Sequence, residues 1–364
     1  MNFITNFLRY LYAAFLIFSG FLKLIDPLGF SYKLQEYFEV FGMDWLINFS
    51  LLLALFVCLL EIFLGIFFIL GLYVRKIIWV NLLLMVAFTF LTFYCAFYNA
   101  VTDCGCFGDF MKLDPWHSFY KDIILVIVSS ILVSKYDYIK PLFTDNKSKI
   151  LLIISCLVFF SIPIDALSHL PFIDFRAYKI GSSIIEGRKN CDEIGKPCAQ
   201  ESFVYVVYDK ANGDTITMDS SEWTAKFEDY SFISNTGKKN ILKKGYEPPI
   251  QDFDIYDING FDFTDSILNM DSVLLLVSYD INKTNLKGHI NFDNASFNSI
   301  PVYGLSSSSP HDIITKLGVD SLSYSYLSVD QTTLKTIIRA NPGLVLLKKG
   351  IVVNKWHWRD IPKK

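Results

Sequence analysis

The sequence FSLLLALFVCLLEIFLGIFFILGLY, residues 49–73, decides the fold, because Glu61 is its only charged residue. About 20 consecutive apolar residues in a helix cross the hydrocarbon layer of a membrane, so this stretch predicts a spanning helix. Residues 7–25 and 77–98 are apolar runs of similar length. Residues 123–133 and 150–164 are shorter, and they span only if flanking residues extend them; otherwise they are interfacial helices.

Basic residues suggest the orientation, since Lys and Arg collect in the loops that stay in the cytoplasm. They lie near the start of the first run, after the second, and between the fourth and fifth: Arg9, Arg75, Lys76, Lys135, Lys140, Lys147 and Lys149. Five spans with a cytoplasmic N-terminus fit all of them. In a bacterial inner membrane, loops 26–48 and 99–118 and the chain after residue 165 then lie in the periplasm, where disulfides form.

Charge is unevenly distributed along the 364 residues. The first 165 residues hold 23 of the 69 charged side chains, and the remaining 199 hold 46. The sequence therefore predicts an apolar membrane half followed by a water-soluble half. The net charge of -3 provides no basic field for nucleic acid, and no phosphate-binding glycine loop or zinc-protease motif occurs.

Two cysteines flank one glycine in DCGCFGD, residues 103–109, at the outer end of the third run. Cys104 and Cys106 can approach disulfide range only if the backbone bends, which Gly105 permits. A strained, exposed disulfide exchanges readily, so the spacing indicates a redox pair. Two alternatives stay open: a turn whose cysteines are reduced or bonded elsewhere, and a metal site that adds Asp109 and His117.

The other cysteines fall into two groups. Cys191 and Cys198 lie in a polar loop after the last run, where a structural disulfide is the favoured interpretation over an exchange partner for the Cys104 pair. Cys58, Cys95 and Cys156 lie inside apolar runs and are interpreted as small hydrophobic residues.

Glu61 would be a carboxylate at membrane depth, which is costly unless it is protonated or paired. Arg9 and Lys23 on the first run are the candidate partners. A proton-handling role and a polar clamp between helices are equally compatible with the sequence.

Several segments carry a family resemblance. RYLYAAFLIFSGFLKLIDP (9–27), LEIFLG (60–65) and LGLYVR (70–75) resemble the first two helices of the DoxX-like membrane family, and CGCFGD (104–109) is similar to its methylamine-utilisation MauE branch. The resemblance covers residues 1–135. It implies a four-helix bundle, to which the fifth span is added. It also implies Cys104 and Cys106 as the redox-active pair and Glu61 as the second-helix acid. In outline the bundle resembles quinone-linked disulfide-generating membrane enzymes, but the sequence shows no quinone signature and does not identify a cofactor.

In the soluble half, the residue pattern predicts a hairpin from strands 203–208 and 215–218. An α/β layer fold is expected after it. Its expected strands are 272–279, 301–305, 343–348 and 351–356, and its expected helices are 311–317 and 331–340. EPPIQDF (247–253) and NPGLVL (341–346) resemble a thioredoxin-like domain of the TlpA type, which implies a cis Pro342. Where that family carries its dithiol this chain has SYDINKT (278–284), and no cysteine follows Cys198.

These expectations divide the chain into a DoxX/MauE-like membrane domain (1–137), a fifth span with its flanks (138–170), a periplasmic linker with a hairpin (171–244) and a thioredoxin-like domain (245–364). The favoured function is thiol-disulfide chemistry on exported proteins through the CxC loop, with the soluble domain docking the client. The alternative is a non-catalytic membrane scaffold that binds an envelope partner. The client and the electron acceptor are not identified by the sequence.

Overall fold

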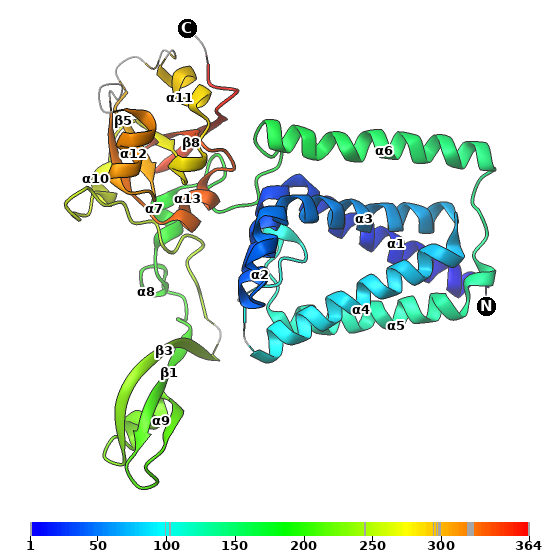
Figure 1. Ribbon diagram of the computed structural model, residues 1–364, viewed down its shortest axis with the longest axis horizontal. Helices are drawn as coiled ribbons and strands as arrows, with labels where there is room; N and C mark the ends of the chain where they lie inside the picture. The colour runs from blue at the N-terminus through cyan, green and yellow to red at the C-terminus, as the bar shows by residue number, and fades with distance from the viewer. Residues whose placement is uncertain are drawn as a thin grey trace.

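The computed structural model describes residues 2–98, 100–101, 103–243, 245–293, 295, 297, 300–318 and 324–362. Its N-terminal half is helical: α1 (Asn2–Ile25), α2 (Pro27–Val40), η1 (Asp44–Phe49), α3 (Ser50–Leu70), α4 (Val74–Tyr98), η2 (Gly108–Phe110), α5 (Pro115–Ser134), η3 (Tyr136–Tyr138) and α6 (Asp145–Ser168). Within the described residues, five helices are long and apolar enough to cross a membrane: α1, α3 with η1, α4, α5 and α6. These helices run alongside one another (Figure 1).

Both shorter apolar runs are completed by their flanks. α5 extends from Pro115 over 20 residues, and α6 begins at Asp145 and has 24 residues. Both helices therefore have the length that a spanning helix needs. The segment 26–48, expected only as an outer loop, contains α2, which lies across one end of the bundle (Figure 1). The sequence contains a typical start of a helix here. The Asp26 side chain accepts a hydrogen bond from Gly29 N as the N-cap, and Pro27 follows at the first helical position.

Glycines bring α1 and α3 into close contact. A Cβ atom at Gly20 would lie 2.8 Å from the Cys58 carbonyl oxygen, and one at Gly65 would lie 2.8 Å from the Ala13 carbonyl oxygen. Small residues of this kind let two membrane helices pack backbone against backbone. This approach holds the Lys23 face of α1 against Glu61 of α3.

Buried polar groups tie the opposite part of the bundle together. The Arg9 guanidinium donates to the carbonyl oxygens of Phe68 and Ile69 at the end of α3, and to that of Lys140. These carbonyls have no partner within their helix, so a cation there stabilises the helix end. The sequence offered Arg9 as a candidate partner of Glu61. That prediction is wrong, because the Arg9 guanidinium binds these carbonyl oxygens instead.

The C-terminal half contains a five-stranded sheet of order β6-β5-β4-β7-β8. Its strands are β4 (Val273–Val277), β5 (Val302–Ser306), β6 (Ser325–Ser328), β7 (Gly343–Lys348) and β8 (Ile351–His357). β4, β5 and β6 are parallel, and β7 runs antiparallel to β4 and to β8. Its helices are α7 (Ile184–Arg188), α8 (Cys191–Ile194), α10 (Thr264–Leu268), η4 (Ile281–Lys283), α11 (Leu286–Asp293), α12 (Pro310–Leu317) and α13 (Gln331–Ile337). The prediction of an α/β region is confirmed, although β6 and α11 were not expected.

Every residue of β4 is buried, which places this strand at the centre of the core. The main buried cluster also includes Tyr178 and Ile184. The segment before the three-stranded sheet therefore packs into the α/β core, whereas the sequence suggested a linker from residue 171. The peptide bond between Asn341 and Pro342 is cis.

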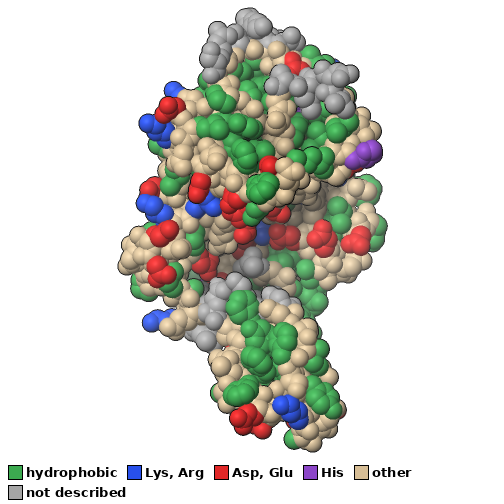
Figure 2. Space-filling view, turned by 90° about the vertical axis from the view of Figure 1, so that its left-hand side faces the viewer, with side chains coloured by type: hydrophobic (Ala, Val, Ile, Leu, Met, Phe, Trp, Pro, Cys, Tyr) green, Lys and Arg blue, Asp and Glu red, His purple; other side chains and the backbone are tan. Residues whose placement is uncertain are grey.

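A separate three-stranded sheet, β2-β1-β3, projects from the α/β domain (Figure 1). It consists of β1 (Gln200–Asp209), β2 (Thr215–Asp219) and β3 (Tyr230–Lys243), with α9 (Ser220–Ala225) packed on it through Trp223. The expected hairpin is present as β1 and β2. The prediction did not include the third strand, because the sequence of β3 is too polar to suggest a strand. Hydrophobic side chains gather on the visible side of this projection (Figure 2).

Candidate functional site

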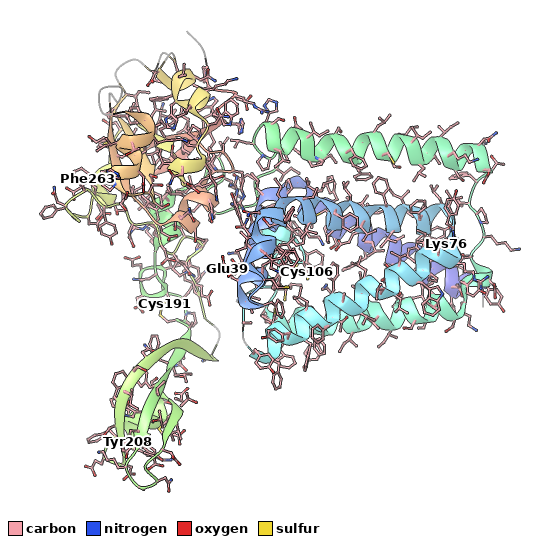
Figure 3. All side chains as sticks on the ribbon, viewed as in Figure 1. Glu39, Lys76, Cys106, Cys191, Tyr208 and Phe263 are labelled. Atoms are coloured by element: carbon pink, nitrogen blue, oxygen red, sulfur yellow. A yellow bond between two sulfur atoms is a disulfide. The ribbon has the colours of Figure 1, made fainter. Side chains whose placement is uncertain are left out.

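The cysteine loop, residues 103–109, lies at the end of the bundle that carries α2 and the α/β domain (Figures 1 and 3). Gly105 has a φ of 63°, the left-handed conformation that glycine adopts without penalty. The Tyr37 hydroxyl of α2 donates to the Cys104 carbonyl oxygen at 2.9 Å, and Lys33 pairs with Asp103 at 3.2 Å. Residues of α2 therefore hold the bend.

Both loop cysteines carry free thiols. Cys104 is buried, and Cys106 is half-buried and nearer to solvent. Burial raises the pKa of Cys104 to about 12, and the neighbouring Cys106 adds to this rise. Burial also raises the pKa of Cys106, although the Lys121 ammonium partly offsets the rise. In this arrangement both thiols hold their protons at neutral pH.

A cavity of about 70 Å³ lies behind the loop inside the bundle. Most of its lining is apolar, and its polar groups are two lysines, two carboxylates, two hydroxyls, one phenol and the two loop cysteines. The polar and sulfur-bearing lining residues are Ser19, Lys23, Tyr37, Glu61, Thr92, Cys104, Cys106, Lys121 and Asp122. The cavity thus brings Glu61 and the cysteine pair, which are far apart in sequence, to one place.

Glu61 is paired with Lys23. Its Oε1 lies 2.5 Å from Lys23 Nζ, and the two side chains are 2% and 3% exposed. Ser19 Oγ donates to Glu61 Oε2 at 3.1 Å and also lies 3.2 Å from the Cys106 carbonyl oxygen. Of the two partners that the sequence offered, Lys23 is the one in contact, and Ser19 links the pair to the loop.

A second ion pair, half-buried Lys121 with buried Asp122, faces the same cavity. Asp122 also accepts a hydrogen bond of 3.0 Å from Thr92 on α4. Sequence analysis did not identify this pair. The sequence feature that could have indicated it is a pair of adjacent opposite charges near the start of an apolar run. Such charges can neutralise each other inside a helical bundle. Both carboxylates of the cavity are therefore matched by lysines.

The side chains of the alternative metal site point to other partners. His117 Nδ1 lies 2.6 Å from Asp114 Oδ2, and Asp109 Oδ2 lies 2.9 Å from Arg339 Nη2. Among the described residues, the ligand atoms that converge as a metal site would require belong to Cys191, Asp192 and Cys198. Asp109 and His117 are therefore paired with Arg339 and Asp114.

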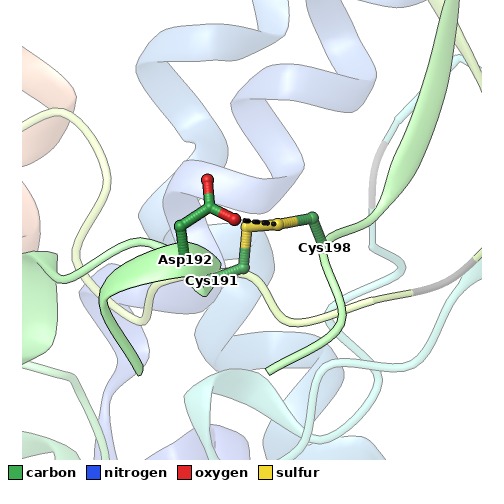
Figure 4. Close-up of side chains that lie close together, drawn as sticks. All are labelled: Cys191, Asp192 and Cys198. Carbon is green, nitrogen blue, oxygen red and sulfur yellow. Dashed lines mark hydrogen bonds between the residues drawn. A yellow bond between two sulfur atoms is a disulfide. The ribbon is translucent and has the colours of Figure 1, made fainter. Parts of the chain in front are cut away.

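Cys191 and Cys198 are joined by a disulfide, whose Cα atoms are 5.1 Å apart (Figure 4). Asp192 Oδ1 lies 3.4 Å from Cys198 Sγ. While the sulfurs are bonded to each other they are not thiolates and do not act as metal ligands in the usual way. Cys191 lies where the three-stranded sheet joins the α/β domain, away from Cys106 (Figure 3).

These observations place a cysteine pair and two neutralised acids at one end of a helical bundle. Residues 1–135 match the family model of methylamine utilisation protein MauE. The match to MauE spans α1 to α5, so it includes the cysteine loop, Glu61 and the whole lining of the cavity. It does not extend to α6 or to the sheets. No curated protein matches the chain.

The chain is accordingly a membrane protein with a MauE-like helical part and an α/β part that follows it. The quinone of the enzymes that the bundle resembles in outline does not fit the cavity as it stands. An engineered cavity of about 150 Å³ accommodates one benzene molecule, and a quinone ring is larger than benzene.

Proposed function

We propose that this protein exchanges thiols and disulfides with exported proteins through Cys104 and Cys106. The observation that carries this proposal is two free thiols on either side of a left-handed Gly105, facing a cavity with matched charges. The bend at glycine suits a sulfur–sulfur bond between residues separated by one position. The expected role as a redox pair is thus part of the proposal.

The exchange balances between the loop and its client. Cys106 gives up its proton, and its sulfur attacks one sulfur of a client disulfide; the other client sulfur leaves and takes up a proton. Cys104 then gives up its proton and attacks Cys106 Sγ, which forms the loop disulfide and releases the second client sulfur to be protonated. Two electrons and two protons pass from the loop to the client, and the reverse sequence oxidises the client.

The cavity has a role in this scheme because each step needs a thiolate. Lys121 faces Cys106 and lowers the cost of its negative charge, while Asp122 neutralises Lys121 when the thiol is protonated. Glu61 and Lys23 form the matching pair on the other side, joined to the loop by Ser19. Glu61 accordingly shapes the charge balance of the site.

The placement in the cell belongs to the proposal. The cysteine loop, α2 and the α/β domain share one end of the bundle, and the N-terminus lies at the other (Figure 1). Basic residues such as Arg75 and Lys76 follow α3 at the N-terminal end, which supports a bacterial inner membrane with a cytoplasmic N-terminus and a periplasmic α/β domain. Cys191–Cys198 then lies where structural disulfides persist.

The α/β domain would be a thioredoxin-like module without a dithiol. Its support is the sheet order, with a central strand flanked by parallel β5 and antiparallel β7, and the position of Tyr279 and Asp280 just after that central strand. Since no cysteine follows Cys198, the domain serves by docking and not by exchange.

Counting thiols tests the proposal. The full-length protein in detergent is equilibrated with oxidised or reduced dithiothreitol and then alkylated after denaturation. We expect oxidation to remove two alkylatable thiols together, and Cys104→Ser or Cys106→Ser to abolish this change. Cys156→Ser, on α6, is the matched control and leaves the two-thiol change intact. A pair that stays reduced under every condition would sink the proposal and leave a membrane scaffold as the function.

A further inference from the structure

One arginine of the α/β domain connects it to the membrane bundle. Arg339 Nε lies 2.7 Å from Asp26 Oδ2, and Arg339 Nη2 lies 2.9 Å from Asp109 Oδ2. Its side chain is only 5% exposed. A guanidinium that bridges two carboxylates in this way is a directional contact, because its donors lie in a fixed plane.

Both carboxylates lead directly to the cysteine loop. Asp109 is the last residue of that loop, three positions after Cys106. Asp26 caps the N-terminus of α2, and α2 carries the Tyr37 hydroxyl that holds the Cys104 carbonyl. Arg339 therefore touches the loop through one carboxylate and the helix that supports the loop through the other.

Aromatic contacts surround this bridge. The Tyr32 ring on α2 lies beneath the charged ends of Lys335 and Arg339, at 4.8 Å and 5.4 Å, and its hydroxyl is 3.3 Å from that of Tyr279. The rings of Phe110 and Phe175 meet edge to face at 5.1 Å. The contact is therefore a packed interface, and the arginine bridge lies within it.

Charge balance makes the bridge sensitive to the loss of the arginine. Burial alone would lower the pKa of Arg339, but Asp26 and Asp109 outweigh burial and hold the pKa above its usual value. Without the guanidinium, the two carboxylates would face each other without compensation. Their repulsion acts on the loop and on α2, the two elements that enclose Cys104.

We propose that Arg339 is a positioning residue for the thiol chemistry: through Asp26 and Asp109 it holds the cysteine loop in the arrangement in which Cys104 is buried and Cys106 is half-buried. A client gains access when this contact is released. This inference rests on the proposed function, because access to the loop matters only if its thiols exchange with a client. The protection itself can be measured whether or not the thiols exchange electrons.

Alkylation of the folded, full-length protein tests the inference. Mass spectrometry follows the rate at which iodoacetamide modifies Cys104 and Cys106 in the reduced loop. For Arg339→Ala we expect a rate about tenfold higher or more, because the protected state loses its compensating charge. The matched control is Arg188→Ala, which removes another arginine of the same domain, paired with Asp254 at 3.1 Å, and leaves the rate unchanged.

Two further variants separate positioning from general loss of structure. In Gly29→Ala the new Cβ would lie 2.7 Å from Arg339 Nη2, so this small change in α2 disturbs the bridge from the membrane side and raises the alkylation rate. The double variant Arg339→Asp with Asp109→Arg restores opposite charges and returns the rate toward that of the wild type. An unchanged or lower rate in Arg339→Ala, or no rescue by the charge reversal, would overturn the inference.

Discussion

The two cysteine pairs of this protein differ in bonding, in spacing and in the groups that surround them. Cys104 and Cys106 are free, enclosed by helices and charged groups, and separated by one residue. Cys191 and Cys198 are bonded, lie toward solvent and are seven positions apart. The comparison shows that spacing alone does not assign a role. One pair closes a short polar loop, while the other lies at a cavity inside the bundle.

The environment explains the contrast. Around the loop pair, burial disfavours the thiolate, and lysines at the same cavity limit that penalty. Around the exposed pair, no comparable enclosure exists in the described residues, since Cys191 lies on a short helix at the base of the three-stranded sheet (Figure 3).

The largest expected effect concerns the pH dependence of Cys104. Because burial raises its pKa from 9.0 to about 12, its thiolate fraction below pH 9 should be about 1,000 times smaller than that of an ordinary cysteine. The alkylation rate of the folded protein should rise about tenfold per pH unit until near pH 12. Reduced, denatured protein provides the control with an ordinary profile. A plateau near pH 9 in the folded protein would contradict the predicted burial.

The buried pair Lys23–Glu61 should be the most sensitive point for bundle stability. Glu61→Gln leaves Lys23 charged without its partner and should lower the free energy of unfolding by about 3–5 kcal/mol. Lys23→Met combined with Glu61→Leu should recover most of this loss. Denaturant unfolding in mixed micelles measures it, and Glu36→Gln, at a half-buried pair with Lys33, is the control. Equal effects of Glu61→Gln and Glu36→Gln would contradict the account.

Acid should weaken the α/β domain that lies against the cysteine loop. Burial lowers the pKa of His289 and of His357 from 6.5 to about 4. Both histidines then take up protons in the unfolded state before they do so in the folded state. Stability is therefore complete above pH 6.5 and falls as the pH drops toward 4, by about 2–3 kcal/mol for each histidine. Pulse proteolysis at each pH measures this, and His289→Gln should remove about half of the slope.

The smallest expected effect is on the exposed disulfide. Cys191→Ser with Cys198→Ser opens a loop of sequence separation seven, which should cost about 2 kcal/mol of local stability. The bundle and the redox behaviour of Cys104 and Cys106 should not change. Hydrogen exchange in β1 and in α3 distinguishes the two regions. Faster exchange in α3 would show that the two cysteine pairs are coupled, contrary to the comparison.

The sequence could predict what depends on local composition. The five apolar helices, the bend at Gly105 and the strands β4, β7 and β8 all follow from hydrophobic runs and turn residues. The helix α2 was missed although its start signal was present, because its surroundings suggested an outer loop. The strand β3 was missed because its polar residues are supported by pairing with β1.

The remaining features depend on contacts between distant parts of the chain. Arg339 meets Asp26 across 313 positions and Asp109 across 230, and no local pattern marks such a partner. The choice of Lys23 over Arg9 as the partner of Glu61 likewise depends on how α1 packs against α3. Packing, and not sequence spacing, decides these pairs.

Redox titration of the intact protein, followed by mass spectrometry of its peptides, tests the central claim most directly. The account predicts that the peptide containing Cys104 and Cys106 becomes lighter by two hydrogen atoms as the dithiothreitol buffer turns oxidising. The Cys191–Cys198 bond should resist reduction to a more reducing point on the same scale. A loop peptide that keeps both thiols across the whole range, while Cys191–Cys198 opens and closes, would contradict the account.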